Sequence, residues 1–210
     1  MLPLVTTIVS GAFAVAVALQ YARKRRPAQL AWAIGLLLFS VAAFMGFLAR
    51  TGGATDVEYR LFYLFGAVAN VAWLALGTIL IVAPRYGRVA LAAVLALSAG
   101  AVYAVFATPV DIAVAVDTGK GFPDGSLPRI LAGIGSGLGS LVLIGGALWS
   151  AWVFFRRRNQ GRRALANAII AVGVFIAAAG GTVAFTGASG ILEFTNLVGV
   201  SVMFVGFLLA

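Results

Sequence analysis

Hydrophobic residues run along this chain in seven long stretches, and short polar segments separate them. A helix needs about 20 apolar residues to cross the hydrocarbon core of a bilayer, which is about 30 Å thick. Each stretch is long enough for this, so the pattern predicts seven transmembrane helices. The predicted spans are 3–22, 28–49, 61–83, 89–106, 130–155, 164–185 and 191–210.

The overall composition agrees with this pattern. Of the 210 residues, 62% are hydrophobic and only 10% are charged, whereas about a quarter of the residues of an average soluble domain are charged. The mean hydropathy is +1.07. We therefore expect an all-α integral membrane protein in which residues 1–210 form one seven-helix membrane domain.

The charged residues are distributed unevenly between the predicted loops. Most Lys and Arg lie in three alternate loops, at 23–26, 85–88 and 156–163, and all six acidic residues lie in or beside the other loops. Loops rich in Lys and Arg stay in the cytoplasm. The N-terminus is therefore expected outside and the C-terminus inside. Topology alone explains the net charge of +9, so no nucleic-acid partner is expected.

The arginine clusters also allow a second interpretation, in which they bind anionic lipid headgroups at the cytoplasmic face. The candidate contacts are Arg23, Arg25, Arg26, Arg156, Arg157 and Arg158. The simpler interpretation is that these residues only fix the topology. Arginine outnumbers lysine 13 to 2 in a chain rich in Ala, Gly and Val, a bias that indicates a GC-rich bacterial genome. We expect a multi-pass protein of a bacterial inner membrane.

One short motif occurs twice. TGGATDVEY at 51–59 and TGASGILEF at 186–194 both begin with Thr-Gly and both end with a glutamate followed by an aromatic residue. The stretches before them, 36–44 and 172–180, also align. We therefore predict a unit of three helices that is used twice, with both copies crossing the membrane in the same direction, as in transporters with parallel repeats. The predicted parts are repeat 1 (1–83), a linker helix (89–106), an extracellular loop (107–129) and repeat 2 (130–210).

This three-plus-one-plus-three order resembles, in topology only, the SWEET sugar carriers and the TRIC-type cation channels. SWEET carriers use prolines inside their helices as hinges, whereas all six prolines of this chain lie at helix ends or in loops. TRIC-type channels carry basic residues in their fourth helix, and 89–106 contains none. The helix count is similar to that of microbial rhodopsins, but the last predicted helix lacks the lysine that retinal needs. No family is assigned.

The two glutamates of the repeated motif are the first candidate site. Thr55 to Glu58 matches a capping box at the start of the third helix, and Glu193 lies in a first helical turn, where a carboxylate suits the helix dipole. Helix capping is therefore the simpler interpretation of both residues. The alternative is that Glu58 and Glu193 face each other around a central axis and form an outer mouth that attracts cations.

Polar side chains within the spans supply a second candidate site. Asn70 lies near the middle of the third helix, Trp73 lies on the same helical face, and Asn196 lies in the outer part of the seventh helix. Asparagine at such depth usually hydrogen-bonds a neighbouring helix. A binding pocket that contains Asn70, Trp73 and Asn196 is the alternative.

Two further segments predict local structure. In the fifth helix, Gly133 with Gly137 and Ser136 with Ser140 are small residues four apart, a spacing that lets another helix approach closely. The loop 107–129 contains the β-branched stretch IAVAV together with turn-forming Gly and Pro residues. For this loop we expect a small ordered lid or hairpin over the outer face.

The residues needed for most enzyme chemistry are missing. The chain contains no His and no Cys, so general acid–base and nucleophilic catalysis are hard to assemble. We predict no catalytic residue, no metal and no cofactor. A passive channel or facilitative transporter for a small neutral solute or a cation is the favoured function. The alternatives are a receptor-like protein that binds a lipid or isoprenoid, and a scaffold that binds partner proteins or copies of itself.

Overall fold

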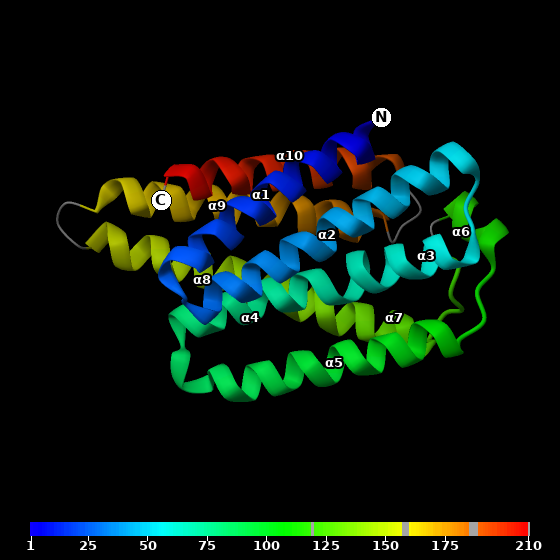
Figure 1. The fold of residues 1–210 in the computed structure, drawn as a ribbon, viewed down its shortest axis with the longest axis horizontal. Helices are drawn as coiled ribbons and strands as arrows, with labels where there is room; N and C mark the ends of the chain where they lie inside the picture. The colour runs from blue at the N-terminus through cyan, green and yellow to red at the C-terminus, as the bar shows by residue number, and fades with distance from the viewer. Residues whose placement is uncertain (119, 157–159, 185–188, 210) are drawn as a thin grey trace.

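The structure is a computed structural model, and it describes residues 1–118, 120–156, 160–184 and 189–209 (Figure 1). In these residues all regular secondary structure is helical. Seven helical segments are long and apolar enough to cross a membrane, which confirms the predicted seven-helix membrane protein. These segments are Leu2–Lys24, Pro27–Gly52, Asp56–Val82, Pro84–Ala107, Leu127–Arg156, Gly161–Gly181 and Ile191–Leu209.

Four of the seven spans are essentially continuous α-helices, and the fourth span adds a short 3-10 turn, η2 (Pro84–Tyr86), before its helix. The four continuous helices are α1 (Leu2–Lys24), α2 (Pro27–Gly52), α9 (Gly161–Ala184) and α10 (Ser189–Leu209), and η2 is followed by α5 (Gly87–Ala107). The third and fifth spans each contain a π-helical segment, which hydropathy does not predict. The third consists of α3 (Asp56–Phe62), η1 (Tyr63–Ala69) and α4 (Asn70–Val82), and the fifth of α7 (Leu127–Ala132), η3 (Gly133–Leu138) and α8 (Gly139–Arg156).

Between α5 and α7 the described residues contain a short helix, α6 (Ile112–Thr118), and no strand. Of the two expected forms of this segment, a lid or a hairpin, the hairpin is therefore wrong at IAVAV. Two contacts explain the helix: the Asp111 carboxylate accepts the backbone N–H of Val114 (3.1 Å) at the helix start, and the buried Ala115 packs into an apolar cluster. The Asp111 N–H donates to the carbonyl of Gly121 (2.9 Å) and closes the segment. We call residues 108–126 the lid.

Six of the spans pack in a closed ring. Going around it, α1 packs on α2, and α2 packs on α3, η1 and α4. Of these, η1 packs on η3, and α4 packs on η3 and α8; α8 packs on α9, α9 on α10, and α10 on α1. The remaining span, α5, lies outside the ring against α4, η1 and α7. Each half of the chain thus contributes three consecutive spans to the ring.

Two clusters of buried side chains hold this arrangement together. The first lies beneath the lid and joins Tyr59, Tyr63 and Val68 to Val105 of α5 and to Phe122 of the lid. The second joins α1, α2 and α10, where Phe13 stacks on Phe204 with ring centroids 4.9 Å apart. Stacked aromatic pairs add to the stability that burial alone provides.

Glycines set the closest helix contacts, but not at the positions that were predicted. Gly135 and Gly139 face the third span, where an added Cβ at Gly135 would meet the carbonyl oxygen of Val68 and one at Gly139 would lie 2.9 Å from Val71. Gly133 and Gly137, the predicted packing pair, have open space around them. Both pairs have the i,i+4 spacing that close packing needs, so the spacing alone does not say which pair faces the neighbouring helix.

Many large hydrophobic side chains are exposed on the outside of the bundle, among them Ile8, Leu37, Tyr103, Leu141 and Phe175. A soluble monomer rarely exposes such extended apolar surface. In a bilayer these side chains contact lipid tails, as expected of a multi-pass membrane protein.

The two glycine positions in the fifth span give a matched test of this packing. We expect Gly135→Ala to destabilise the protein by about 1–3 kcal/mol, because its methyl group collides with backbone and overpacking has costs of this size. Gly137→Ala has room for its methyl group and gains about 0.5–1 kcal/mol of helix propensity. Thermal unfolding of both variants in the same detergent checks this, and equal melting temperatures would contradict the glycine contact.

Candidate functional site

Charged side chains divide the bundle into two unlike ends. The acidic residues whose side chains are described all lie at one end, at Asp56, Glu58, Asp111, Asp124 and Glu193. We call this the acidic end, and it also holds the lid. The opposite end, where α1 ends and α2 begins, holds most of the Lys and Arg residues and is called the basic end.

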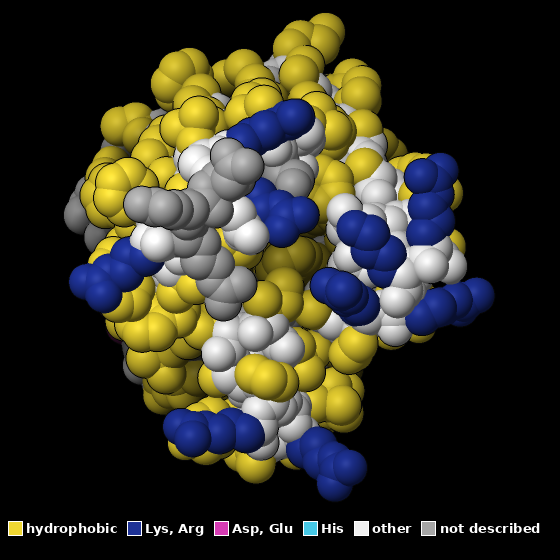
Figure 2. All heavy atoms as spheres, turned by 90° about the vertical axis from the view of Figure 1, so that its left-hand side faces the viewer, with side chains coloured by type: hydrophobic (Ala, Val, Ile, Leu, Met, Phe, Trp, Pro, Cys, Tyr) yellow, Lys and Arg dark blue, Asp and Glu magenta, His cyan; other side chains and the backbone are white. Residues whose placement is uncertain are grey.

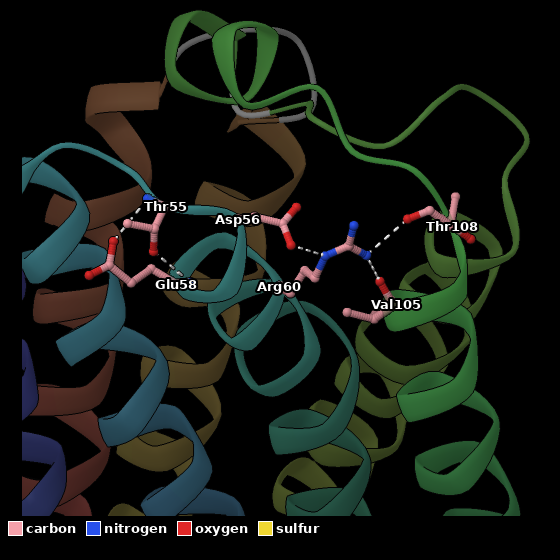
Figure 3. Close-up of polar contacts among 6 residues, drawn as sticks. All are labelled: Thr55, Asp56, Glu58, Arg60, Val105 and Thr108. Atoms are coloured by element: carbon pink, nitrogen blue, oxygen red, sulfur yellow. Dashed lines mark hydrogen bonds and ion pairs between the residues drawn. The ribbon is translucent and has the colours of Figure 1, made fainter.

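At the acidic end, the third span begins with the capping box that the sequence predicts. The Glu58 backbone N–H donates to the Thr55 hydroxyl (3.3 Å), and the Thr55 N–H donates to the Glu58 carboxylate (3.0 Å) (Figure 3). The pair satisfies two backbone donors that a helix start leaves free. Glu58 therefore has a structural role in starting the helix.

Arg60, two residues further on, is a buried charge that the sequence analysis missed. Its Nε donates to the Asp56 carboxylate (2.7 Å), and its Nη1 donates to the carbonyls of Val105 and, at 2.9 Å, Thr108 (Figure 3). These carbonyls belong to the last turn of α5 and the residue after it, where carbonyls lack partners within the helix. A cation suits this helix end electrostatically. Arg60 thus ties the third span to the fourth.

The lid is anchored next to Arg60 by aromatic residues. The Gly121 N–H donates to the hydroxyl of Tyr59 (2.9 Å), and the buried ring of Phe122 lies edge-on to Tyr63 with centroids 4.9 Å apart. The Arg60 guanidinium lies 5.9 Å from the centroid of the Phe122 ring. These contacts hold the lid against the third span, so it covers this corner of the acidic end.

The Tyr63 hydroxyl is an exception in this well-paired corner. It is buried, and within the described part of the chain it has no hydrogen-bond partner. Buried polar groups without partners are rare, and each one calls for an explanation such as a bound water or ligand. Tyr63 is also the first residue of the π-helical segment η1, a type of segment that is frequent at functional sites.

Glu193, the second glutamate of the repeated motif, forms an ion pair with Arg50 across the acidic end. Its Oε1 lies 2.5 Å from Nη2 of Arg50, at the end of α2. Helix α1 stands between α2 and α10 in the ring, so the ion pair joins two helices that are not neighbours. Glu58 and Glu193 each have a partner of their own. That the two glutamates share one outer mouth stays a prediction.

The residues of the predicted pocket point to different neighbours. Asn70 is buried, and its Oδ1 accepts the N–H of Val71 (2.6 Å). The Trp73 indole N–H donates to the hydroxyl of Ser98 in α5 (3.3 Å). The indole is therefore directed toward α5, the helix that lies outside the six-span ring. Asn196 is half-buried in α10, which packs on α9 and α1. A common pocket of these three residues stays a prediction.

The arginines of the predicted lipid contacts lie at the basic end. Arg23, Arg25, Arg26 and Arg156 are exposed, and Arg25 is the one described non-glycine residue with a left-handed backbone (φ 51°). Arg157 and Arg158 lie outside the described residues, as do Thr186 and Gly187 of the repeated motif. In the part of the chain that the structure describes, no three His, Cys, Asp or Glu side chains are grouped so that they would hold a metal.

Comparison with protein-family models, curated proteins and solved structures finds no match to this chain. The class that the sequence and fold define is a polytopic membrane protein with seven membrane-spanning helices. Any finer function has to be argued from the residues themselves.

Arg60 can be tested against an exposed arginine of the same end. We expect Arg60→Gln to lower the free energy of unfolding by about 1–3 kcal/mol, because buried carbonyls lose their donor. Arg129→Gln removes an ion pair with Asp124, which is 91% exposed, and such pairs contribute only about 0–1 kcal/mol. Thermal unfolding measures both, and hydrogen exchange should become faster at the end of α5 in the Arg60 variant alone. Similar losses in the two variants would contradict the role of Arg60.

Proposed function

We propose that this protein is a facilitative membrane transporter for a small uncharged solute. The observation that carries the proposal is the closed ring, in which each half of the chain supplies three consecutive spans in the same order. This order is what two parallel three-helix repeats around an axis along the membrane normal require. The solute path is the axis between the two halves.

The polarity of the described interior favours an uncharged solute. Between α1, α2 and α10 the ring is filled by apolar side chains such as Phe13, Val17, Leu36 and Val200. The hydroxyls nearby already donate to backbone carbonyls: Ser10 donates to the carbonyl of Thr6 (2.6 Å), and Ser40 donates to the carbonyl of Thr7 (2.9 Å). Ion pathways through membranes usually carry ionisable residues. A cation is therefore the less favoured substrate.

The ion pair between Arg50 and Glu193 is the element that holds the acidic end closed in this proposal. It joins the first half of the ring to the second, and its partners are 55% and 20% exposed. Ion pairs this exposed contribute about 0.2–1 kcal/mol, which corresponds to a population change of at most about fivefold. The pair is weak enough to break in each transport cycle.

Flux measurements in proteoliposomes test the proposal. We expect wild-type protein to accelerate the osmotic swelling of vesicles in at least one member of a panel of uncharged solutes such as polyols, urea and sugars. Glu193→Gln should increase that rate by up to about fivefold, since the acidic end opens more often. The exchanged pair, Arg50→Glu with Glu193→Arg, should return the rate toward the wild-type value.

Glu58→Gln is the matched control, because it also removes a glutamate charge at this end, and glutamine still completes a capping box. Its flux should equal that of wild type. If Glu193→Gln behaves like Glu58→Gln while wild type transports, the ion pair has no gating role. If wild-type vesicles match empty vesicles for every solute, the transporter proposal itself fails, and a retained adduct in native mass spectrometry would then favour a binding protein.

The orientation is a separate prediction, with the acidic end outside the cell. Gly52→Cys at the acidic end and Gly161→Cys at the basic end each have open space for a side chain, and each provides a single thiol because the chain has no cysteine. In intact bacterial cells, a membrane-impermeant maleimide should label only Cys at position 52. Labelling of position 161 before permeabilisation would reverse the assigned orientation.

A further inference from the structure

The basic residues at the two ends of the bundle differ in whether they form ion pairs. Among the described residues there are three ion pairs, formed by Arg50, Arg60 and Arg129, and all three lie at the acidic end. At the basic end no described Lys or Arg has an acidic side chain within 4 Å. The basic residues there that the structure describes are Arg23, Lys24, Arg25, Arg26, Arg85, Arg88, Arg156, Arg162 and Arg163.

These residues form a rim around the basic end. They come from the end of α1, the turn before α2, the short helix η2, the start of α5, the end of α8 and the start of α9, and all are exposed. Figure 2 shows their side chains spread around the whole face, with hydrophobic side chains between them and no Asp or Glu in view. We call this set the basic rim. Its unneutralised charge needs anions from outside the protein.

Aromatic residues fix the depth of the rim. The Arg156 guanidinium lies 4.1 Å from the centroid of the Trp152 ring, and Trp152 packs against Trp149 with centroids 5.1 Å apart. Arg85 lies over Tyr86 (4.7 Å) in the same manner. Exposed Trp and Tyr residues at the ends of spans lie at the level of the lipid headgroups. The paired arginines are therefore held at the depth of lipid phosphates.

We propose that the basic rim binds anionic phospholipids of the adjacent leaflet, with the strongest site at Trp152 and Arg156. An anionic lipid offers a phosphate at the right depth without a cationic group of its own, and its acyl chains lie against the exposed rings of Trp149 and Trp152. The rim extends beyond the six lipid contacts predicted from the sequence, because Arg85, Arg88, Arg162 and Arg163 also belong to it. The proposal does not depend on transport.

Quenching of tryptophan fluorescence by brominated lipids tests this directly. The protein is reconstituted in phosphatidylcholine vesicles that contain phosphatidylglycerol, with bromine on the acyl chains of one lipid or the other. At low ionic strength we expect brominated phosphatidylglycerol to quench more strongly than its mole fraction predicts, with an enrichment of about fivefold, the effect of one basic residue near an anionic surface. High salt should reduce the enrichment.

Arg156→Gln should remove most of the enrichment, and it leaves Trp149 and Trp152 in place. Arg85→Gln with Arg88→Gln is the second variant, and it should lower the number of phosphatidylglycerol molecules retained in native mass spectrometry. Arg129→Gln, which removes one arginine at the acidic end, is the matched control and should change neither readout. Equal quenching by the two brominated lipids in wild type, or an equal loss in the Arg129 variant, overturns the proposal.

Discussion

The rest of this structure depends on one constraint: backbone polar groups in the hydrocarbon core must find partners within the protein, because no water is present there. Helices meet this requirement throughout the spans. The two π-helical segments, where the regular bonding pattern changes, lie against each other in the third and fifth spans. There the Ser136 hydroxyl donates to the carbonyl of Ala67 (2.7 Å). The irregular backbone is therefore placed where a neighbouring helix can serve it.

The same reasoning explains what could be predicted from the sequence. The seven spans follow from apolar length alone, and the capping box at Thr55 and Glu58 follows from local residue types, so both were predicted and confirmed. The π-helical segments leave no trace in hydropathy. The sequence GIGSGLG contains two glycine pairs with the same spacing, and only the fold shows that Gly135 and Gly139 face the third span while Gly133 and Gly137 do not.

Tertiary context accounts for the other differences. Arg60 looks like an ordinary charge near a helix start, and only the arrival of the end of α5 next to it makes it a buried ligand of two carbonyls. The stretch IAVAV favours a strand by composition. It forms a helix because Asp111 caps it and the residues that follow are tied to Tyr59. Asp111 is adjacent in the sequence, but the contacts with Tyr59 and with the end of α5 come from residues far away in the chain.

The two seams of the ring differ in a way that bears on the proposed transport cycle. Between the third and fifth spans the backbones are in close contact at Gly135 and Gly139, and any sliding there drives atoms into backbone. Between α1 and α10 the contact is made by aromatic rings, with Phe13 against Phe204 and Phe207. A side chain can change rotamer at a modest energetic cost. A collision between backbone atoms cannot be relieved in this way.

A relative movement of the two halves would therefore pivot on the glycine seam and open the aromatic seam. The ion pair between Arg50 and Glu193 spans the acidic end beside that aromatic seam, because α1 lies between its two helices. In the proposed transport cycle a weak ion pair at this place would oppose opening, because its two partners belong to different halves of the ring. The position of the pair, more than its strength, is what suits it to a gate.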